Sequence, residues 1–487
     1  MKDRILRYKA SSKSSGSYVL YWMQQAQRIH CNPAFDYAVA KAQELKLGLI
    51  VCFVLSDEIP EANMRHYRFM LEALLEIAVG LAKRKIPFHV LLGKPTELIP
   101  RLGQKARLLV LDHGYLNWQR TWRDAIFSSE LLSDTELVQL DTEATIPVHL
   151  ASDKEEYTAA TLRRKLVAKL PDWASYPDPP HYDIEPQYLD LQGIAHYPYD
   201  MLDIDALWAW ACSELKLHPS PDIVGGITGG YEQAQKKLSL FIKEKLSAYA
   251  QYRNHPDLDY TSELSPYLHF GQISALEIIH KVFEAWQVPI DTLPQLIANK
   301  KQLTGNSLNL ADYAEELIVR RELSMNFCFY NPDYDSAMCL PNWARKTLNN
   351  HLMDAREQHY SLDRLEQGET DDIYWNAAQR QMIFSGKMHG YMRMYWGKRL
   401  LSWCPSVDEA QEILLYLNNK YELDGRDVNA YAGIAWCFGK HDRPWAERPI
   451  FGMVRFMNAA GLKRKFDMDA YLRKVDLILR GKDEILA

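Results

Sequence analysis

Residues 47–55 read LGLIVCFVL, an almost unbroken apolar run. Such a run is too short to span a bilayer and is typical of a strand buried on both faces of a parallel sheet. Outward from it, further β-rich runs lie at residues 17–22, 88–92, 108–111 and 136–140. Apolar residues at helical spacing separate these runs at residues 33–45, 64–84 and 95–102. The alternation predicts a Rossmann-like α/β domain with an open parallel sheet over residues 1–150.

The pattern changes after this domain. Stretches rich in Pro, Tyr and Asp, such as YPDPPHYDIEP at residues 176–186, predict an irregular connector over residues 175–221, within an interdomain linker over residues 151–229. From residue 230 to residue 487 the apolar spacing is almost wholly helical. We therefore expect an α/β domain, a long linker and a larger all-helical domain.

The composition narrows the class of protein. The chain has 487 residues, of which 47% are hydrophobic and 25% charged, as in soluble globular proteins. It has no apolar run long enough to cross a bilayer, no signal-peptide layout at its start and no Cys/His pattern of a metal site. We expect a monomer that is not secreted, lies in the cytoplasm (or the nucleus of a eukaryote), and binds neither a membrane nor a metal.

Common catalytic motifs are also missing. The sequence has neither GxGxxG nor GxxxxGK[ST], no nucleophile elbow and no HExxH. Any chemistry is therefore expected to depend on a bound cofactor.

The segment TSELS at residues 261–265 precedes a helical pattern. Its hydroxyl groups suit either a diphosphate at the start of a helix or simple helix capping. The stretch LDGRDVNAYAGIAW at residues 423–436 has no periodicity. It offers carboxylates and amides to a cofactor, or forms a turn-rich connector. In either case Asp424 is expected to pair with Arg393 and fix this loop.

Tryptophans are spaced as on helices. Trp396 and Trp403 lie seven residues apart and so share one helix face, and Trp375 falls on the preceding helix. Indoles at this spacing serve either as core or as a chain that passes electrons to a buried redox centre.

Residues 440–465 contain seven Lys and Arg against two acidic residues, interleaved with Trp445, Phe451 and Phe456. The pattern suits nucleic acid, because basic groups bind phosphates and aromatic rings stack on bases. An ordinary charged surface is the alternative.

Four long motifs give the sequence a family resemblance. They are TSELSPYLHFGQIS, EELIVRRELSMNFCFYNPDYD, WNAAQRQMIFSGKMHGYMRMYWGKRLLSW and YELDGRDVNAYAGIAWCFGKHDRPWAERPIFGMVRFMNAAGLKRK. Together they resemble class II cyclobutane pyrimidine dimer photolyases, densely from about residue 252 to residue 471. The resemblance implies light-driven repair of pyrimidine dimers in ultraviolet-damaged DNA by a reduced, anionic FAD bound in the helical domain.

The resemblance also assigns residues by matching these motifs. For FAD binding it implies Tyr252, Thr261, Ser262, Glu263, Leu264, Ser265, Arg393, Asn418, Asp424 and Asp427. For catalysis it implies the electron chain Trp396, Trp375 and Trp403, in order from flavin to surface, together with Glu316, Asn418 and Met394. For the lesion and the DNA backbone it implies Glu316, Met394, Trp436, Arg443, Arg448, Arg455, Lys463, Arg464 and Lys465. Asn418 matches the amide beside flavin N5, with Asn429 as the alternative.

Two alternatives stay open at this point. A cryptochrome-like photoreceptor would keep the flavin and the tryptophans without repairing DNA, and a non-enzymatic nucleic-acid-binding protein would bind no flavin. The sequence also leaves open whether an antenna chromophore, a deazaflavin or a folate, binds the first domain. Residues 21–35, YWMQQAQRIHCNPAF, and residues 111–127, LDHGYLNWQRTWRDAIF, depart from the family pattern there.

Overall fold

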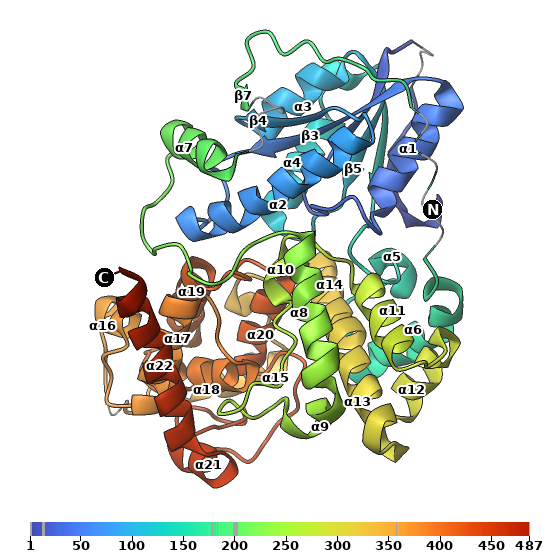
Figure 1. Ribbon diagram of the computed structural model, residues 1–487. Coiled ribbons are helices and arrows are strands. Elements are labelled where there is room, and N and C mark those ends of the chain that lie inside the picture. Colours follow the sequence, from blue (N-terminus) through green and yellow to red (C-terminus); the bar gives the residue numbers. More distant parts are fainter. Residues whose placement is uncertain are drawn as a thin grey trace.

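The computed structural model describes residues 2–11, 15–176, 180, 182, 184–197, 203–356 and 358–486. Figure 1 shows an α/β domain, coloured blue to cyan, above a helical domain coloured green to red. This is the predicted fold class. Among the described residues, no helix is both long and apolar enough to cross a membrane, and no group of His, Cys, Asp and Glu is arranged to hold a metal ion.

A seven-stranded sheet forms the centre of the first domain, in the order β1-β6-β5-β2-β3-β4-β7. Its strands are β1 (Ile5–Lys9), β2 (Tyr18–Trp22), β3 (Gly48–Leu55), β4 (Phe88–Leu92), β5 (Ala106–Asp112), β6 (Glu136–Leu140) and β7 (His196–Tyr197). The five central strands are parallel, and every residue of β2 and β3 is buried. The predicted central strands are thus confirmed.

The sheet edges differ from the prediction. β1 pairs antiparallel with β6, and β7 pairs antiparallel with β4, so the sheet is not parallel throughout. β1 was missed because none of its five residues is buried, so ILRYK forms no continuous apolar run. β7 has two residues and follows a Pro-rich stretch, so it leaves no periodic signal.

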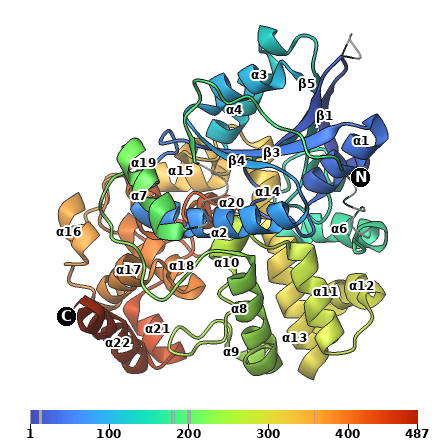
Figure 2. The same cartoon turned by 45° about the horizontal axis from the view of Figure 1, so that its top comes forward.

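Helices cover the sheet and border the second domain. They are α1 (Pro33–Leu45), α2 (Met64–Lys83), α3 (Pro95–Gly103) and α4 (Asn117–Phe127). Asn32 begins α1 by accepting hydrogen bonds from the backbone N–H groups of Ala34 and Phe35. Figures 1 and 2 both place α2 between the sheet and the helices of the second domain.

The predicted linker contains regular structure. Residues 151–229 contain the last residue of α5 (Val148–Ala151), all of α6 (Ala159–Trp173), β7 and α7 (Ile204–Glu214). α6 packs against α12 of the helical domain, and α7 packs against α2. The expectation of an irregular connector over residues 175–221 is therefore wrong for β7 and α7, whereas α6 lies in the part of the linker before it. Parts of the Pro-rich motif at residues 176–186 lie outside the described residues.

The second domain is helical, as predicted. Its helices are α8 (Tyr231–Glu244), α9 (Tyr249–Tyr252), α10 (Ser265–His269), α11 (Ala275–Ala285), α12 (Leu293–Asn299), α13 (Gly305–Ala314), α14 (Arg321–Tyr330), α15 (Asn342–Asn350), α16 (Leu362–Gln367), α17 (Ile373–Ser385), α18 (Gly390–Leu401), α19 (Val407–Tyr421), α20 (Val428–Cys437), α21 (Ala459–Lys465) and α22 (Met468–Leu486). A π-helical segment, η6 (Glu315–Arg320), joins α13 to α14. Such wide turns are frequent at functional sites.

Candidate functional site

A pocket of about 570 Å³ opens in the helical domain. Met394 from α18, Trp436 from α20 and Glu316 from η6 all line it, so the structure brings together the three expected lesion-contacting residues. Thr261 of the TSELS segment and Asn429 of α20 line the same pocket. Residues from four separate stretches of chain therefore share one cavity.

Two arginines in this pocket were missed by sequence reasoning. Arg253 Nη1 lies 2.9 Å from Glu316 Oε1, so the glutamate faces the pocket as half of an ion pair. The Arg320 guanidinium lies 5.1 Å from the centre of the Trp436 ring, a cation–π distance. The π-helical turn brings both Glu316 and Arg320 to the pocket. The sequence pattern gives no sign of such a turn.

A buried charged cluster is built around Arg393. Its guanidinium forms a short ion pair with Glu422 and lies 3.7 Å from Asp424. The predicted contact with Asp424 is thus present, but the closer partner is Glu422, which was missed. Burial raises the pKa of Glu422 well above its usual range. Burial alone would also raise the pKa of Asp424, yet the Arg393 guanidinium lowers it.

Three buried polar atoms near this cluster lack hydrogen-bond partners: Arg393 Nε, Glu422 Oε1 and Asn418 Oδ1. Asn418 is fully buried and lies one helical turn before Glu422. Unpaired buried polar groups are costly, so a native site supplies a ligand for them. The Arg393 N–H donor and the Asn418 acceptor fit the carbonyl and N–H edge of a flavin ring.

The TSELS segment lies beside this cluster. The Ser265 hydroxyl contacts Asp424, and the Ser262 hydroxyl contacts Tyr313. Leu264 is buried, and the Tyr252 ring packs 5.0 Å from the Tyr260 ring, without a described contact to the segment itself.

Two lysines bring positive charge to the segment. Glu263 binds Lys237 at 2.6 Å and Lys387 at 2.8 Å, and Lys387 also donates to the Thr261 hydroxyl at 3.4 Å. Although burial would raise the pKa of Glu263, the two ammonium groups lower it to about 2. These cations suit the diphosphate that the resemblance places here.

The remaining loop residues have separable roles. Asp427 caps α20 by accepting a hydrogen bond from the backbone N–H of Asn429 at 2.8 Å, and it contacts His269. The Asn429 side chain donates to the same carboxylate at 2.7 Å. The Asn418 acceptor is unpaired, and this favours Asn418 over Asn429 as the flavin-facing amide.

The three expected tryptophans form one continuous contact. The rings of Trp396 and Trp375 are stacked at 6.1 Å, and those of Trp375 and Trp403 meet edge-on at 5.4 Å. Trp396 and Trp375 are fully buried, and Trp403 is 5% exposed. Tyr360 continues the series 5.0 Å beyond Trp403. Exposure thus increases in the order that the resemblance implies.

Of the expected DNA-backbone residues, Arg455 lines the pocket itself. Arg443 and Arg455 flank the ring of Trp445, which is 40% exposed. A neighbouring cavity of about 350 Å³ is lined by Arg448, Arg455, Arg464 and Lys465, and Lys463 lies over Tyr374. Phe451, interpreted from sequence as a stacking aromatic, is instead buried against Phe456.

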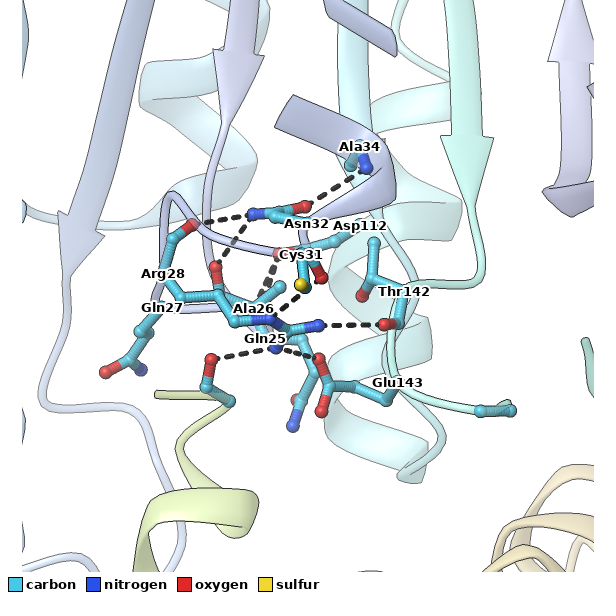
Figure 3. Close-up of polar contacts among 12 residues, drawn as sticks. Gln25, Ala26, Gln27, Arg28, Cys31, Asn32, Ala34, Asp112, Thr142 and Glu143 are labelled. Atoms are coloured by element: carbon cyan, nitrogen blue, oxygen red, sulfur yellow. Dashed lines mark hydrogen bonds and ion pairs between the residues drawn. The ribbon is translucent and has the colours of Figure 1, made fainter. Parts of the chain in front are cut away.

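The loop after β2 is held rigidly at the carboxyl edge of the sheet. Asp112 accepts hydrogen bonds from the backbone N–H groups of Gln24, Gln25 and Ala26 at 2.8–3.0 Å. Figure 3 shows the Arg28 guanidinium reaching the loop after β6, where it binds Thr142 O and the Glu143 carboxylate. This loop lies where the strand order reverses between β2 and β5, the usual ligand position in such sheets.

A small cavity of about 50 Å³ lies between this loop and the helical domain. Gln24 Oε1, Gln27 Oε1 and Trp118 Nε1 are buried at it without hydrogen-bond partners. The polarity of these atoms fits a heterocyclic ring. The cavity is too small to admit one unless the lining side chains move apart.

A family model, curated relatives and a solved structure all match this chain. The DNA photolyase family model matches residues 19–180. The chain is 43% identical over 460 residues to the deoxyribodipyrimidine photo-lyase of Methanothermobacter thermautotrophicus, covering 94% of this chain and 95% of that one. It is 38% identical over 475 residues to the enzyme of the same name from Potorous tridactylus, covering 97% and 84%.

A solved structure shows the same fold. The bacterial class III photolyase from Agrobacterium tumefaciens superimposes with a TM-score of 0.69 at 18% identity, over 95% of this chain and 87% of that chain. The resemblance deduced from the sequence motifs is thereby confirmed, and the chain belongs to the deoxyribodipyrimidine photo-lyase family.

Proposed function

We propose that this protein repairs cyclobutane pyrimidine dimers in DNA with light, using FAD bound in its helical domain. The observation that carries this proposal is the pocket of about 570 Å³ lined by Glu316, Met394 and Trp436. When bound and reduced, FAD supplies on illumination the electron that splits the dimer. Family membership supports the same reaction, because the relatives are deoxyribodipyrimidine photo-lyases.

The chain itself holds and orients this cofactor. Arg393 Nε offers a donor and Asn418 Oδ1 an acceptor to the ring, and both atoms are buried without protein partners. Arg393 also places positive charge beside the ring, which favours an anionic reduced form. Lys237 and Lys387 stand near the TSELS segment for the diphosphate.

The pocket walls suit a dimer flipped out of the duplex. The face of Trp436 offers stacking, and the Glu316–Arg253 pair offers hydrogen bonds to the carbonyl and N–H groups of pyrimidine bases. Six basic residues supply positive charge for the phosphates of the DNA backbone: Arg443, Arg448, Arg455, Lys463, Arg464 and Lys465. Affinity should therefore fall as salt is raised.

The direct test is repair of thymine-dimer DNA by purified, reduced protein, in blue light and in the dark, with the absorbance spectrum recorded first. We expect a flavin spectrum and loss of dimers only in the light. A flavin spectrum without repair would instead support a cryptochrome-like photoreceptor. Absence of both, in folded protein supplied with FAD, would support a nucleic-acid-binding protein without a flavin.

Replacing Glu316 with alanine should lower the repair yield per absorbed photon. The variant loses an acceptor and leaves Arg253 with only the more distant carboxylate of Asp312, at 3.9 Å. A lost charged hydrogen bond corresponds to roughly a tenfold change. The bound-flavin spectrum should stay unchanged. Glu284→Ala, at an exposed position, is the matched control. Equal yields for the two variants would remove Glu316 from the reaction.

The cavity at the sheet edge is the proposed site of an antenna chromophore, a deazaflavin or a folate. The unpaired Gln24, Gln27 and Trp118 atoms are what favours it. Chromophore-free protein should take up one equivalent of a deazaflavin, and light absorbed by that chromophore should then drive repair. Replacing Gln27 with leucine should abolish uptake without changing the FAD content. Failure of wild-type protein to take up either chromophore would contradict this part of the proposal.

A further inference from the structure

The C-terminal end of α19 carries two groups of the candidate flavin site, Asn418 and Glu422. The last four carbonyl groups of an α-helix have no partners within the helix and need other donors. Here most of the end of the helix is buried, with only Lys420 partly exposed, so water has little access to those carbonyls. Asn419 is 2% exposed, and Glu422 is not exposed at all.

Side chains from the start of α2, in the other domain, supply most of these donors. The pairs are Lys420 O with Asn63 Nδ2 at 2.8 Å, Tyr421 O with Arg65 Nη1 at 2.6 Å, and Glu422 O with His66 Nε2 at 2.9 Å. Arg65 also donates to Ile383 O at the end of α17, at 2.9 Å. Three consecutive carbonyls are thus capped from three positions within one turn of α2.

The histidine in this set has a defined tautomer. The backbone N–H of Asn63 donates to His66 Nδ1 at 3.2 Å, so the ring proton is on Nε2 and points to Glu422 O. Burial lowers the pKa of His66 well below its usual range, and the neighbouring Arg426 guanidinium acts in the same direction. His66 therefore does not titrate near pH 7, and Arg65 is the charged member of the cap.

A second set of contacts extends from this cap to Asn418. The Asn418 amide donates to Asn419 Oδ1 at 3.3 Å, which also accepts from the backbone N–H of Arg426 at 2.9 Å. Asn419 Nδ2 donates to Glu61 Oε2 at 3.2 Å, another group of the α/β domain. Because the Asn419 amide is held from both sides, its oxygen faces Asn418, and the Asn418 oxygen is left free.

We propose that Asn63, Arg65 and His66 are positioning residues of the flavin site. They fix the end of α19, so that Asn418 Oδ1 and the Arg393–Glu422–Asp424 cluster keep one orientation toward FAD. The inference rests on the proposed function, because it needs FAD at this cluster. It gives the α/β domain a part in holding the flavin that is separate from any antenna chromophore.

Contacts elsewhere on α2 argue against a role in domain adhesion alone. Arg68, within one turn of Arg65, pairs with Glu72 at 3.0 Å and with Asp205 at 3.3 Å, away from α19. By contrast, Asn63, Arg65 and His66 are each 2% exposed, and each donates to the end of α19. The same helix therefore offers a matched control.

The test is a double-mutant cycle on the rate at which FAD leaves the full-length protein, with Arg65→Met, Asn418→Ala and both changes together. We expect each single change to speed release roughly tenfold, and the double variant to be little worse than the more affected single one, because coupled residues are not additive. Arg68→Met should release FAD at the wild-type rate. Additive effects, or equal rates for Arg65→Met and Arg68→Met, would overturn the inference.

A milder variant keeps the test decisive if Arg65→Met does not fold. Asn63→Ala removes one hydrogen bond, to Lys420 O, and enters the same cycle with the same expectations. The fine structure of the blue flavin absorption band should change in Asn63→Ala and not in Arg68→Met. Wild-type protein that binds no FAD would refute the proposed function itself. A cycle that is additive in FAD-loaded, repair-competent protein would refute only this inference.

Discussion

Replacing Arg393 with methionine is expected to abolish FAD retention and to destabilise the helical domain. Arg393 is the cation between Glu422 and Asp424, and its Nε is an unpaired donor in the candidate flavin site. Methionine fills similar space but leaves the ionised Asp424 buried without its partner. Removal of one member of a buried pair costs about 3 kcal/mol. Purified variant should carry no flavin absorbance and unfold at a lower temperature.

Two further variants show whether the positive charge of Arg393 is responsible for FAD retention and for the unfolding temperature. Glu422→Gln should keep both FAD and the wild-type unfolding temperature, because burial raises the pKa of Glu422 and so favours its neutral form, and glutamine preserves its shape. Arg380→Met removes an exposed arginine of α17 and should change neither property. If Arg393→Met retains FAD and unfolds like Arg380→Met, the cluster has no part in cofactor binding.

The sheet was predictable where burial leaves a continuous apolar run. β2 and β3 are buried along their whole length. For β3, the apolar run LGLIVCFVL indicates this burial. β1 and β7 lie at the edges, where one side of a strand faces solvent or the strand is very short. α6 and α7 were hidden for a different reason. Their apolar residues pack against α12 and α2, contacts that no local pattern reveals.

The residues of the candidate site also fall into those that the sequence could identify and those that only the fold reveals. Trp375 and Trp396 lie on the two helices that their spacing predicted, α17 and α18. Trp403 lies two residues past the end of α18, so the expectation that it shares a helix face with Trp396 is wrong, although its ring still meets that of Trp375. Glu422 was not, because it lies two residues before Asp424 and only the fold decides which carboxylate meets Arg393. Arg320 was missed because the π-helical turn carries no sequence periodicity, and Arg253 was missed because it follows α9 and meets Glu316 only through the fold. The capping of α19 by α2 joins residues more than 350 positions apart in the chain.

Replacing Trp396 with phenylalanine should block photoreduction of oxidised enzyme while sparing repair by enzyme that is reduced beforehand. Trp396 stacks on Trp375 at 6.1 Å, and phenylalanine is far harder to oxidise than tryptophan. We expect the photoreduction rate to fall to less than about a hundredth of the wild-type rate, a barrier about 3 kcal/mol higher. Steady illumination of the oxidised protein with an external reductant, followed by absorbance, measures this rate.

Measuring both photoreduction and repair by pre-reduced enzyme distinguishes a loss of electron transfer to the flavin from damage to the pocket. Trp396 is buried and donates to Gln379 Oε1 at 3.0 Å, so its loss also leaves a small cavity and an unpaired amide oxygen. If that damage reached the pocket, repair by chemically reduced variant would fall too, whereas an electron-chain role leaves it within about twofold of wild type. Trp343→Phe, at a tryptophan of α15 outside the chain, controls for loss of an indole. Wild-type photoreduction in Trp396→Phe would mean that electrons reach the flavin by another route, and the stacked tryptophans would then be core residues alone.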